Sequence, residues 1–284
     1  MRNMIELMIT GGLGNQMFQY ACARALQLEN NDDFQMNTGL FGADRFGRSY
    51  SLEACSIPDE VRIVDRPAMM LKLLGGVSNY AEELVFSIMK HFGVYIWKGR
   101  TYKELDCGKK KNILFGYFQS EKYFSEHSEI IKKELKISKP ISEENKLWID
   151  EINRTNAVCL HIRRGDYLKE NLIVCDLDYY KNAVAYMKEH LADPRFFVFS
   201  DDIEWVKANL RDPAFRYVDN NNVDYDELRL MYHCKHFIMS NSSFSWWAQY
   251  LSDNEDKIVI APPRWMPDDS VPEIYMDSWL VLNR

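Results

Sequence analysis

A dense run of polar residues in "AVCLHIRRGDY" is the first place where this sequence could do chemistry, because Arg163 and Arg164 directly follow an apolar strand-like segment. Adjacent residues at the end of a strand point to opposite faces. One guanidinium can therefore face a ligand while the other pairs with Asp166 or with a neighbouring loop. A guanidinium fork suits a diphosphate better than an ammonium does. A surface Arg–Asp pair is the alternative, but the polar density from His161 to Tyr167 favours a functional site.

A second polar cluster, "SNSSFSWW", follows another apolar run and also begins a predicted helix. Asn241, Ser242 and Ser243 stand where a helix N-cap belongs. The first turn of a helix presents backbone N–H groups and the positive end of the helix dipole, which together favour a phosphate. An ordinary cap followed by two core tryptophans explains the same residues equally well.

A third cluster, Ser200, Asp201 and Asp202, ends the apolar run "RFFVFS". Two acids in this position commonly cap the next helix, here "DDIEWVKANL". Alternatively, one carboxylate accepts hydrogen bonds from the N1–H and N2–H₂ donors of a guanine base. The sequence leaves open which of the two acids would do so.

The glycine-rich stretch "GGLGNQM" near the N-terminus resembles a nucleotide-binding turn but departs from it. Met17 occupies the place where the dinucleotide fingerprint needs its last Gly or Ala. Gly12 and Gly14 allow a ligand to approach the backbone closely. Asn15 and Gln16 can form hydrogen bonds with hydroxyl groups. A plain glycine turn capped by Asn15 is the alternative.

The elements that must position these residues alternate between strands and helices. Apolar runs at 157–162, 195–200 and 236–240 are separated by amphipathic helical segments, and residues 4–9 precede a helix in the same manner. This alternation predicts parallel sheets covered by helices on both faces. Ligands of such sheets bind beyond the carboxyl ends of the strands. All of the polar clusters lie at such ends.

A change in composition near Pro140 divides the chain into two predicted α/β domains, residues 1–140 and 141–284. Within the first domain, the elements of residues 31–110 are harder to identify than those of the second domain. Helices are expected around "AMMLKLLGG" and "YAEELVFSIMKHF", and "NILFGYFQSEKYF" is expected to be a strand that leads into a helix.

The composition excludes several classes of protein. The 284 residues carry a net charge of −7, which argues against a nucleic-acid-binding surface. The N-terminus lacks the pattern of a signal peptide, and no segment is long and apolar enough to span a bilayer. The six cysteines are scattered without a C-x-x-C pair, which indicates free thiols in a reducing cytoplasm.

A metal site is not expected. Two D-x-D strings, Asp176–Asp178 and Asp224–Asp226, each precede a predicted helix, where aspartate is a favoured cap. Neither string is interpreted as a metal ligand, and the six histidines show no ligand spacing.

Taken together, "GGLGNQMFQYA", "HIRRGDY", "FSDD" and "SNSSFSWW" resemble in order and spacing the α-1,2-fucosyltransferases of glycosyltransferase family 11, over residues 5–262. "HIRRGDY" also resembles the motif of α-1,6- and protein O-fucosyltransferases. The resemblance implies a GT-B fold, in which two Rossmann-like domains face each other across a cleft. It also implies a GDP-L-fucose donor, a terminal galactose acceptor, and inversion at the anomeric carbon without a metal or other cofactor.

The resemblance assigns GDP-fucose to the C-terminal domain and the acceptor to the N-terminal domain. Arg163 would stabilise the leaving diphosphate, and His161 with Asp201 or Asp202 would hold guanine. Asp166 and Glu170 are candidates for the base that takes the acceptor's proton, and a dissociative path with little need of a base stays open. The expected donor-binding residues are His161, Arg163, Arg164, Ser200, Asp201, Asp202, Asn241, Ser242, Ser243, Phe244 and Ser245.

The predicted activity is therefore the transfer of L-fucose to the 2-hydroxyl of a terminal galactose on an oligosaccharide or glycolipid. Two other functions stay open. A non-catalytic glycan-binding protein would need no diphosphate site, and a nicotinamide-dependent oxidoreductase would need the missing third glycine. We expect a cytoplasmic protein without a transmembrane segment; peripheral contact with the inner membrane and the oligomeric state are left open.

Overall fold

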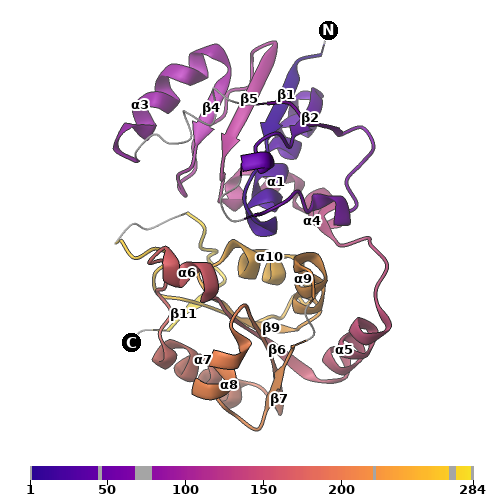
Figure 1. The fold of residues 1–284 in the computed structure, drawn as a ribbon, viewed down its shortest axis with the longest axis vertical. Coiled ribbons are helices and arrows are strands. Elements are labelled where there is room, and N and C mark those ends of the chain that lie inside the picture. The colour runs from indigo at the N-terminus through magenta and orange to yellow at the C-terminus, as the bar shows by residue number, and fades with distance from the viewer. Residues whose placement is uncertain (1, 44–46, 68–78, 220–221, 269–272, 283–284) are drawn as a thin grey trace. The chain divides into compact units, whose positions relative to one another are not determined.

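A computed structural model describes residues 2–43, 47–67, 79–219, 222–268 and 273–282 of the chain (Figure 1). The chain divides into two compact units, Met1–Ser138 and Lys139–Arg284, here called the N-terminal and C-terminal units. The division lies next to Pro140, where the composition changes. The helix expected at 68–76 lies outside the described residues.

The N-terminal unit contains a five-stranded sheet in the order β3-β2-β1-β5-β4, and every pairing in it is parallel. β1 is central. The chain first builds the sheet from β1 through β2 to β3, and later adds β5 on the other side of β1. The switch point of this sheet therefore lies between β1 and β5. The strands are β1 Met4–Met8, β2 Asp33–Asn37, β3 Arg62–Val64, β4 Val94–Trp97 and β5 Lys111–Gly116.

The first helix of this unit, α1, is buried over most of its surface, and it is held by a charged network as well as by apolar packing. Arg24 is 6% exposed and its Nη2 lies 2.7 Å from Oε1 of Glu134. The Tyr20 hydroxyl donates to Oε2 of the same carboxylate at 2.6 Å. These bonds tie α1 to α4. The helices are α1 Leu13–Asn30, α3 Asn79–Met89 and α4 Ser128–Leu135, and the 3₁₀ turns are η1 Phe41–Ala43, η2 Leu52–Ala54, η3 Lys90–Phe92, η4 Glu121–Tyr123 and η5 Ser125–His127.

The C-terminal unit contains a six-stranded sheet in the order β11-β10-β9-β6-β7-β8, again with parallel pairing throughout. β6 and β7 are long and almost wholly buried, as expected for strands covered on both faces. β7 and β8 lie on one side of β6, and β9 to β11 on the other, so the switch point lies between β6 and β9. The strands are β6 Asn156–Ile162, β7 Pro194–Ser200, β8 Phe215–Tyr217, β9 His236–Ile238, β10 Val259–Ala261 and β11 Leu280–Val281.

Helices α5 to α10 complete this unit, and the capping predicted at the first of them is present. The Ser142 side chain accepts from the backbone N–H of Asn145 at 3.1 Å and begins α5. The expectation of two Rossmann-like α/β domains is confirmed. The short strands β8, β10 and β11 were not expected from the sequence. The helices are α5 Glu143–Arg154, α6 Gly165–Lys169, α7 Leu177–His190, α8 Ile203–Asn209, α9 Asp224–Tyr232 and α10 Ser243–Leu251.

Candidate active site

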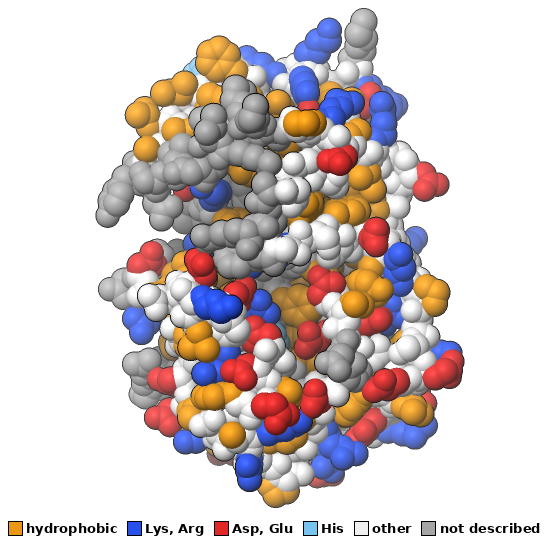
Figure 2. All heavy atoms as spheres, in the orientation of Figure 1, with side chains coloured by type: hydrophobic (Ala, Val, Ile, Leu, Met, Phe, Trp, Pro, Cys, Tyr) orange, Lys and Arg blue, Asp and Glu red, His pale blue; other side chains and the backbone are white. Residues whose placement is uncertain are grey.

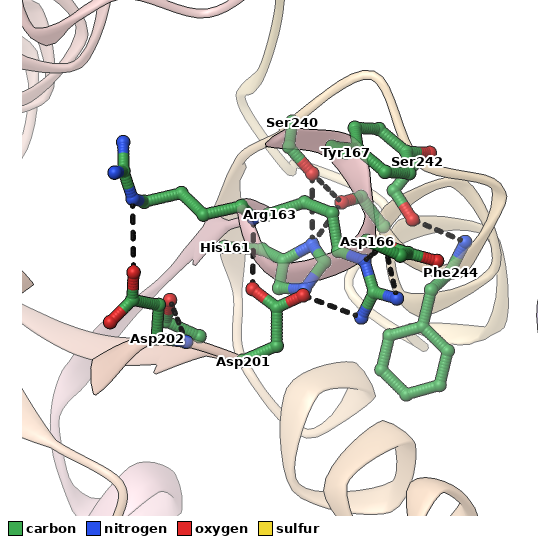
Figure 3. A network of polar contacts seen from close by, with 12 residues as sticks. His161, Arg163, Asp166, Tyr167, Asp201, Asp202, Ser240, Ser242 and Phe244 are labelled. Carbon is green, nitrogen blue, oxygen red and sulfur yellow. Dashed lines mark hydrogen bonds and ion pairs between the residues drawn. The ribbon is translucent and has the colours of Figure 1, made fainter. Parts of the chain in front are cut away.

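Three strands of the C-terminal unit bring the predicted polar clusters to one edge of the sheet. Arg163 follows β6, Asp201 follows β7 and Ser240 follows β9. β6 pairs with both of the other strands, and its junction with β9 is the switch point. Figure 3 shows that the side chains from these strand ends form one network of polar contacts.

Arg163 is the centre of this network and is held by two carboxylates (Figure 3). Its Nη2 lies 2.8 Å from Oδ1 of Asp166, and its Nη1 lies 3.1 Å from Oδ2 of Asp201. Burial lowers the pKa of Arg163, but Asp201 and Asp166 outweigh this effect and raise the pKa above its ordinary value. The Arg163 side chain remains 31% exposed. The structure thus presents a fixed, partly accessible cation at the switch point.

Asp201 also fixes the backbone beside this cation. Its Oδ1 accepts from the backbone N–H of Arg164 at 2.8 Å. Gly165 follows directly, and a Cβ atom at Gly165 would lie 2.7 Å from Oδ2 of Asp201, which is closer than real Cβ contacts allow. The glycine of "HIRRGDY" therefore leaves room for the carboxylate that orients Arg163, a role that the sequence analysis did not identify.

The second arginine of the motif points to a different set of partners. Nε of Arg164 lies 3.3 Å from Oδ2 of Asp202, and its guanidinium lies 3.4 Å from the centroid of the Trp205 ring. Asp202 also caps α8, because its Oδ1 accepts from the backbone N–H of Trp205. The Ser200 hydroxyl in turn accepts from the backbone N–H of Asp202 at 3.0 Å. The two arginines diverge as predicted, but Asp166 pairs with Arg163, the arginine assigned to the diphosphate.

His161 lies beneath this charged layer and is 3% exposed. Its Nδ1 is 2.5 Å from the Ser245 hydroxyl and 3.1 Å from the Ser240 hydroxyl, and the two hydroxyls are 3.0 Å apart. Burial lowers the pKa of His161 to about 3, and the charge of Arg163 adds to this effect. His161 is therefore a neutral imidazole fixed by two serines. Ser245, which the sequence analysis expected as a nucleotide contact, is 1% exposed and has this supporting role.

The N-terminus of α10 begins at Ser243 beside these residues. The Ser242 hydroxyl accepts from the backbone N–H of Phe244 at 3.2 Å, as an N-cap does. The Phe244 ring centroid is 5.8 Å from that of His161. The predicted N-cap position is thus correct at Ser242, and the positive end of the α10 dipole lies at the same sheet edge as Arg163.

Asn241, also expected as a nucleotide contact, is buried and has partners within the unit. It is 5% exposed, and its Nδ2 donates to the carbonyl oxygens of Leu172 at 2.9 Å and Trp265 at 3.0 Å. Its own carbonyl accepts from the Tyr167 hydroxyl at 3.2 Å. Asn241 therefore ties together three segments that surround the site.

Among the carboxyl groups proposed as a base, Asp166 is a partner of Arg163, whereas Glu170 follows α6 and is exposed. The structure adds Glu227 of α9, which the sequence analysis missed. Burial raises the pKa of Glu227 to about 7; Arg163 opposes this increase, and Asp201 reinforces it. A helical glutamate in "YDELRLMYHC" gives no sign of this environment, which arises only from the tertiary structure.

The D-x-D strings lie at helix N-termini, as predicted. Asp176 caps α7 by accepting from the backbone N–H of Tyr179 at 2.8 Å. Asp224 begins α9, and Asp226 lies 3.5 Å from Nη2 of Arg229. Among the described residues, no group of three or more His, Cys, Asp or Glu side chains is placed to hold a metal ion.

The glycine-rich loop of the N-terminal unit is closed by hydrogen bonds of its own. Gln16 is fully buried, and its side-chain amide donates to the carbonyls of Gly11 and Ser49, both at 2.8 Å. Its Oε1 accepts from the backbone N–H of Ser51 at 2.9 Å. The sequence analysis expected Gln16 to be available to hydroxyl groups; the structure shows that its polar side-chain atoms all have partners within the unit.

The other residues expected in that loop differ in exposure. Gly14 is buried in the first turn of α1, whereas Gly12, its N-cap, and Asn15 are partly exposed. Oδ1 of Asn15 accepts from Nε2 of Gln119 at 2.8 Å, which links the ends of β1 and β5 across the switch point. Gly12 and Asn15 thus remain the loop's accessible groups.

Within the described residues, none of the helices has the length and apolar content needed to cross a bilayer.

Solved structures resemble this chain over most of its length. The crystal structure of NodZ alpha-1,6-fucosyltransferase soaked with GDP-fucose matches with a TM-score of 0.53 at 12% identity, covering 88% of this chain and 93% of that one. POFUT1 in complex with GDP matches with a TM-score of 0.53 at 14% identity, covering 91% and 98%. These likenesses confirm the predicted GT-B type of fold with its two Rossmann-like domains.

Sequence relatives are similar at higher identity. The O-antigen biosynthesis glycosyltransferase WbnK of Escherichia coli is 30% identical over 96% of this chain and 99% of its own. An alpha-1,2-colitosyltransferase of Escherichia coli is 32% identical over 90% of each chain. A galactoside 2-alpha-L-fucosyltransferase of Caenorhabditis elegans is 27% identical over 90% of this chain and 71% of its own. The family model of glycosyl transferase family 11 matches residues 79–283, and the chain is a fucosyltransferase-like glycosyltransferase that belongs to this family.

Proposed function

We propose that this glycosyltransferase moves L-fucose from GDP-β-L-fucose to the 2-hydroxyl of a terminal galactose, with inversion at the anomeric carbon. The observation that carries the proposal is Arg163, a partly exposed cation held by Asp166 and Asp201 at a switch point. The galactoside 2-alpha-L-fucosyltransferase among the relatives supports the choice of donor and acceptor. The alpha-1,2-colitosyltransferase makes a colitosyl donor the second candidate.

The leaving group explains why such a cation is needed. Breaking the bond between fucose C1 and the phosphate oxygen leaves negative charge on the diphosphate. In our proposal, Arg163 and the N-terminus of α10 stabilise that charge, and each preorganised donor of this kind contributes about 3 kcal/mol to transition-state stabilisation. Asp166 and Asp201 hold the guanidinium in place before the nucleotide arrives, so little reorganisation is needed.

Guanine recognition is assigned to the same edge of the sheet. His161 is neutral, so its imidazole can donate from one nitrogen while the other faces the serine hydroxyls. Asp201 and Asp202 both have arginine partners, so whichever reads guanine must share its carboxylate with an arginine. GDP should therefore raise the melting temperature more than UDP does at equal concentration. Asp201→Asn and Asp202→Asn, made separately, identify the residue that causes the difference.

We further propose that catalysis needs no metal, because Arg163 and the α10 dipole supply the positive charge. Turnover should persist after EDTA treatment. Activity that EDTA abolishes and that Mn²⁺ or Mg²⁺ restores would contradict this part of the proposal.

The acceptor's proton can be taken by one of three carboxyl groups near the motif, or by none of them in a dissociative reaction. Burial raises the pKa of Glu227 to about 7, which is in the range that suits a general base at neutral pH. Asp166→Asn, Glu170→Gln and Glu227→Gln separate the candidates, because only loss of the base removes the acidic limb of the pH–rate profile.

The experiment that tests the function measures GDP release from GDP-fucose in the presence and absence of galactosides that differ in the next sugar. We expect release that depends on a terminal galactose with a free 2-hydroxyl, and a fucosylated product. A galactoside blocked at the 2-hydroxyl is the control. Binding of galactosides without GDP release would favour a non-catalytic glycan-binding protein, and faster release from a colitosyl donor would favour the second candidate.

A further inference from the structure

Helix α3 in the N-terminal unit is apolar on two opposite faces. One face packs on the sheet: Phe86 is 6% exposed, and its ring lies 6.2 Å from Tyr95 and 5.7 Å from Trp97 of β4. Val85 and Met89 pack against the core cluster on the same side. These contacts account for the burial that holds α3 to the unit.

The opposite face exposes large apolar side chains where a surface helix ordinarily carries polar ones. Leu84 is 64% exposed, Ile88 is 50% exposed, and Phe92, in the 3₁₀ turn η3 that continues the helix, is 74% exposed. The three residues are four positions apart, so they form one line along the helix. We call this line the α3 stripe. Figure 2 shows hydrophobic side chains gathered over α3, at the upper left of that view. Single exposed apolar residues are common, but a continuous group of them indicates an interaction surface.

Lysines border the α3 stripe at its C-terminal end. Lys90 lies within η3, and Lys109 approaches the turn after Phe92, because a Cβ atom at Gly93 would lie 3.2 Å from Cβ of Lys109. Lys109 and Lys110 are both exposed. Residues 79–111 contain seven Lys and Arg residues against four acidic ones, in a chain whose net charge is −7. Positive charge therefore exceeds negative charge in this part of an acidic chain, although Glu83, beside Leu84, is exposed and pairs with Lys103 at 3.1 Å.

We propose that the α3 stripe and the lysines beside it dock the protein on the surface of an anionic lipid bilayer. Leu84, Ile88 and Phe92 enter the boundary between headgroups and acyl chains, and Lys90, Lys109 and Lys110 contact the anionic headgroups. The lysines argue against a second copy of this chain as the occupant, because a symmetric contact through the stripe would bring like charges together. The inference does not depend on which sugar is transferred.

The test is co-sedimentation of the full chain with vesicles. Vesicles of phosphatidylglycerol and phosphatidylethanolamine should bind the protein, with binding that weakens as salt rises, and vesicles of phosphatidylcholine alone should bind it much less. The variant Leu84→Ser/Ile88→Ser/Phe92→Ser should lose roughly tenfold in affinity for the anionic vesicles. Lys109→Glu/Lys110→Glu should lose the preference for anionic lipid and most of the salt dependence.

Matched controls use residues of similar exposure elsewhere. Leu147→Ser removes a side chain that is 70% exposed on α5, and Lys133→Glu/Lys181→Glu reverses two exposed charges outside the stripe. Both controls should bind vesicles as the parent does. Because all of these side chains are exposed, melting temperatures should change little. The proposal is overturned if the parent does not bind anionic vesicles, if the stripe variant binds them equally well, or if light scattering shows a dimer that the stripe variant dissociates.

Discussion

Each unit has a helix N-terminus at the switch point of a parallel sheet, but the chemistry at the two switch points differs. In the N-terminal unit the side-chain amides of Gln16 and Asn15 are bonded within the unit, and Nε of Arg48 would lie 4.0 Å from a Cβ atom at Gly12. In the C-terminal unit the groups are charged, and Arg163 shares two carboxylates while it remains partly open to solvent.

The two arrangements respond differently to an entering anion. A buried amide whose donors and acceptors are all used can bind a ligand only by breaking hydrogen bonds that stabilise the fold. An arginine that two carboxylates hold, and whose side chain is still 31% exposed, can meet a further anion on its open side without breaking those two pairs. The predictions below separate these behaviours.

Replacing Arg163 should have the largest effect. Arg163→Ala should lose roughly a hundredfold or more in turnover, the loss seen when one transition-state donor is removed. Arg163→Lys should recover little, because an ammonium keeps the charge but loses the bidentate fork. Turnover is measured as GDP release and folding as a melting curve. Arg216→Ala, which breaks an exposed pair with Glu151 in the same unit, is the control. A folded Arg163→Ala enzyme with parental turnover would remove the basis of the proposed mechanism.

Gly165→Ala should have the next largest effect, because its methyl group would collide with the Asp201 carboxylate. Displacement of that carboxylate frees one side of Arg163, and a misplaced catalytic group commonly costs tenfold to about a hundredfold in rate. We expect kcat to fall while the melting temperature changes little. Gly42→Ala, where a Cβ atom meets nothing within 4 Å, should be neutral. Equal kcat values for the two variants would show that turnover does not depend on the present position of the Asp201 carboxylate.

Gln16→Leu tests the switch point of the N-terminal unit. It leaves two carbonyls and one N–H without their partner, which should lower the free energy of unfolding by about 1–3 kcal/mol. The increase in melting temperature on adding GDP should be the same as in the parent. Asn30→Ala, which removes an exposed amide bonded to the Leu26 carbonyl on the same helix, should change stability far less. Loss of the GDP effect in Gln16→Leu would instead place this loop in the nucleotide site.

The last two predictions concern the pH dependence of stability. The pKa of His161 is lowered from 6.5 to about 3, so the folded state binds fewer protons than the unfolded state between these values. Its contribution to stability is lost as the pH falls below 6.5. The pKa of Glu227 is raised from 4.5 to about 7, so its contribution is lost as the pH rises through that range.

The stabilities of the two corresponding variants, each compared with that of the parent, should therefore depend on pH in opposite directions. Relative to the parent, the melting temperature of His161→Asn should increase from pH 6.5 to pH 4, and that of Glu227→Gln should increase from pH 5 to pH 8. Parallel curves for parent and variant would show that the residue titrates alike in the folded and unfolded states.

The sequence predicted the elements whose burial is strong and continuous. β6 and β7 stand out because nearly every residue in them is buried, and the polar residues after them were correctly placed at one sheet edge. β10 and β11 have three and two residues, too few for a periodic pattern, so they could not be recognised. Such short strands form because they pair with neighbouring strands, and the sequence of the short strand itself does not show this pairing.

The partners of polar side chains were predicted less well, for a physical reason. Whether Ser245 or Asn241 contacts a ligand or supports the fold depends on residues far away in the chain, such as His161 and Trp265. Hydrogen bonds between residues far apart in the chain produce no periodic pattern in the sequence. The effect of Gly165 on Asp201 is of the same kind, because it depends on the register between β6 and β7.

The position of β6 between β7 and β9 has a consequence for synthesis on the ribosome. β7 emerges soon after β6 and can pair with it, whereas the serines that hold His161 follow 79 and 84 residues later. Until β9 and α10 emerge, one edge of β6 has no strand to pair with, and such an edge favours contacts with other chains. A nascent chain stalled before residue 236 would therefore hold most of the motif residues and yet be prone to aggregation, so the unit depends on rapid completion of its last strands.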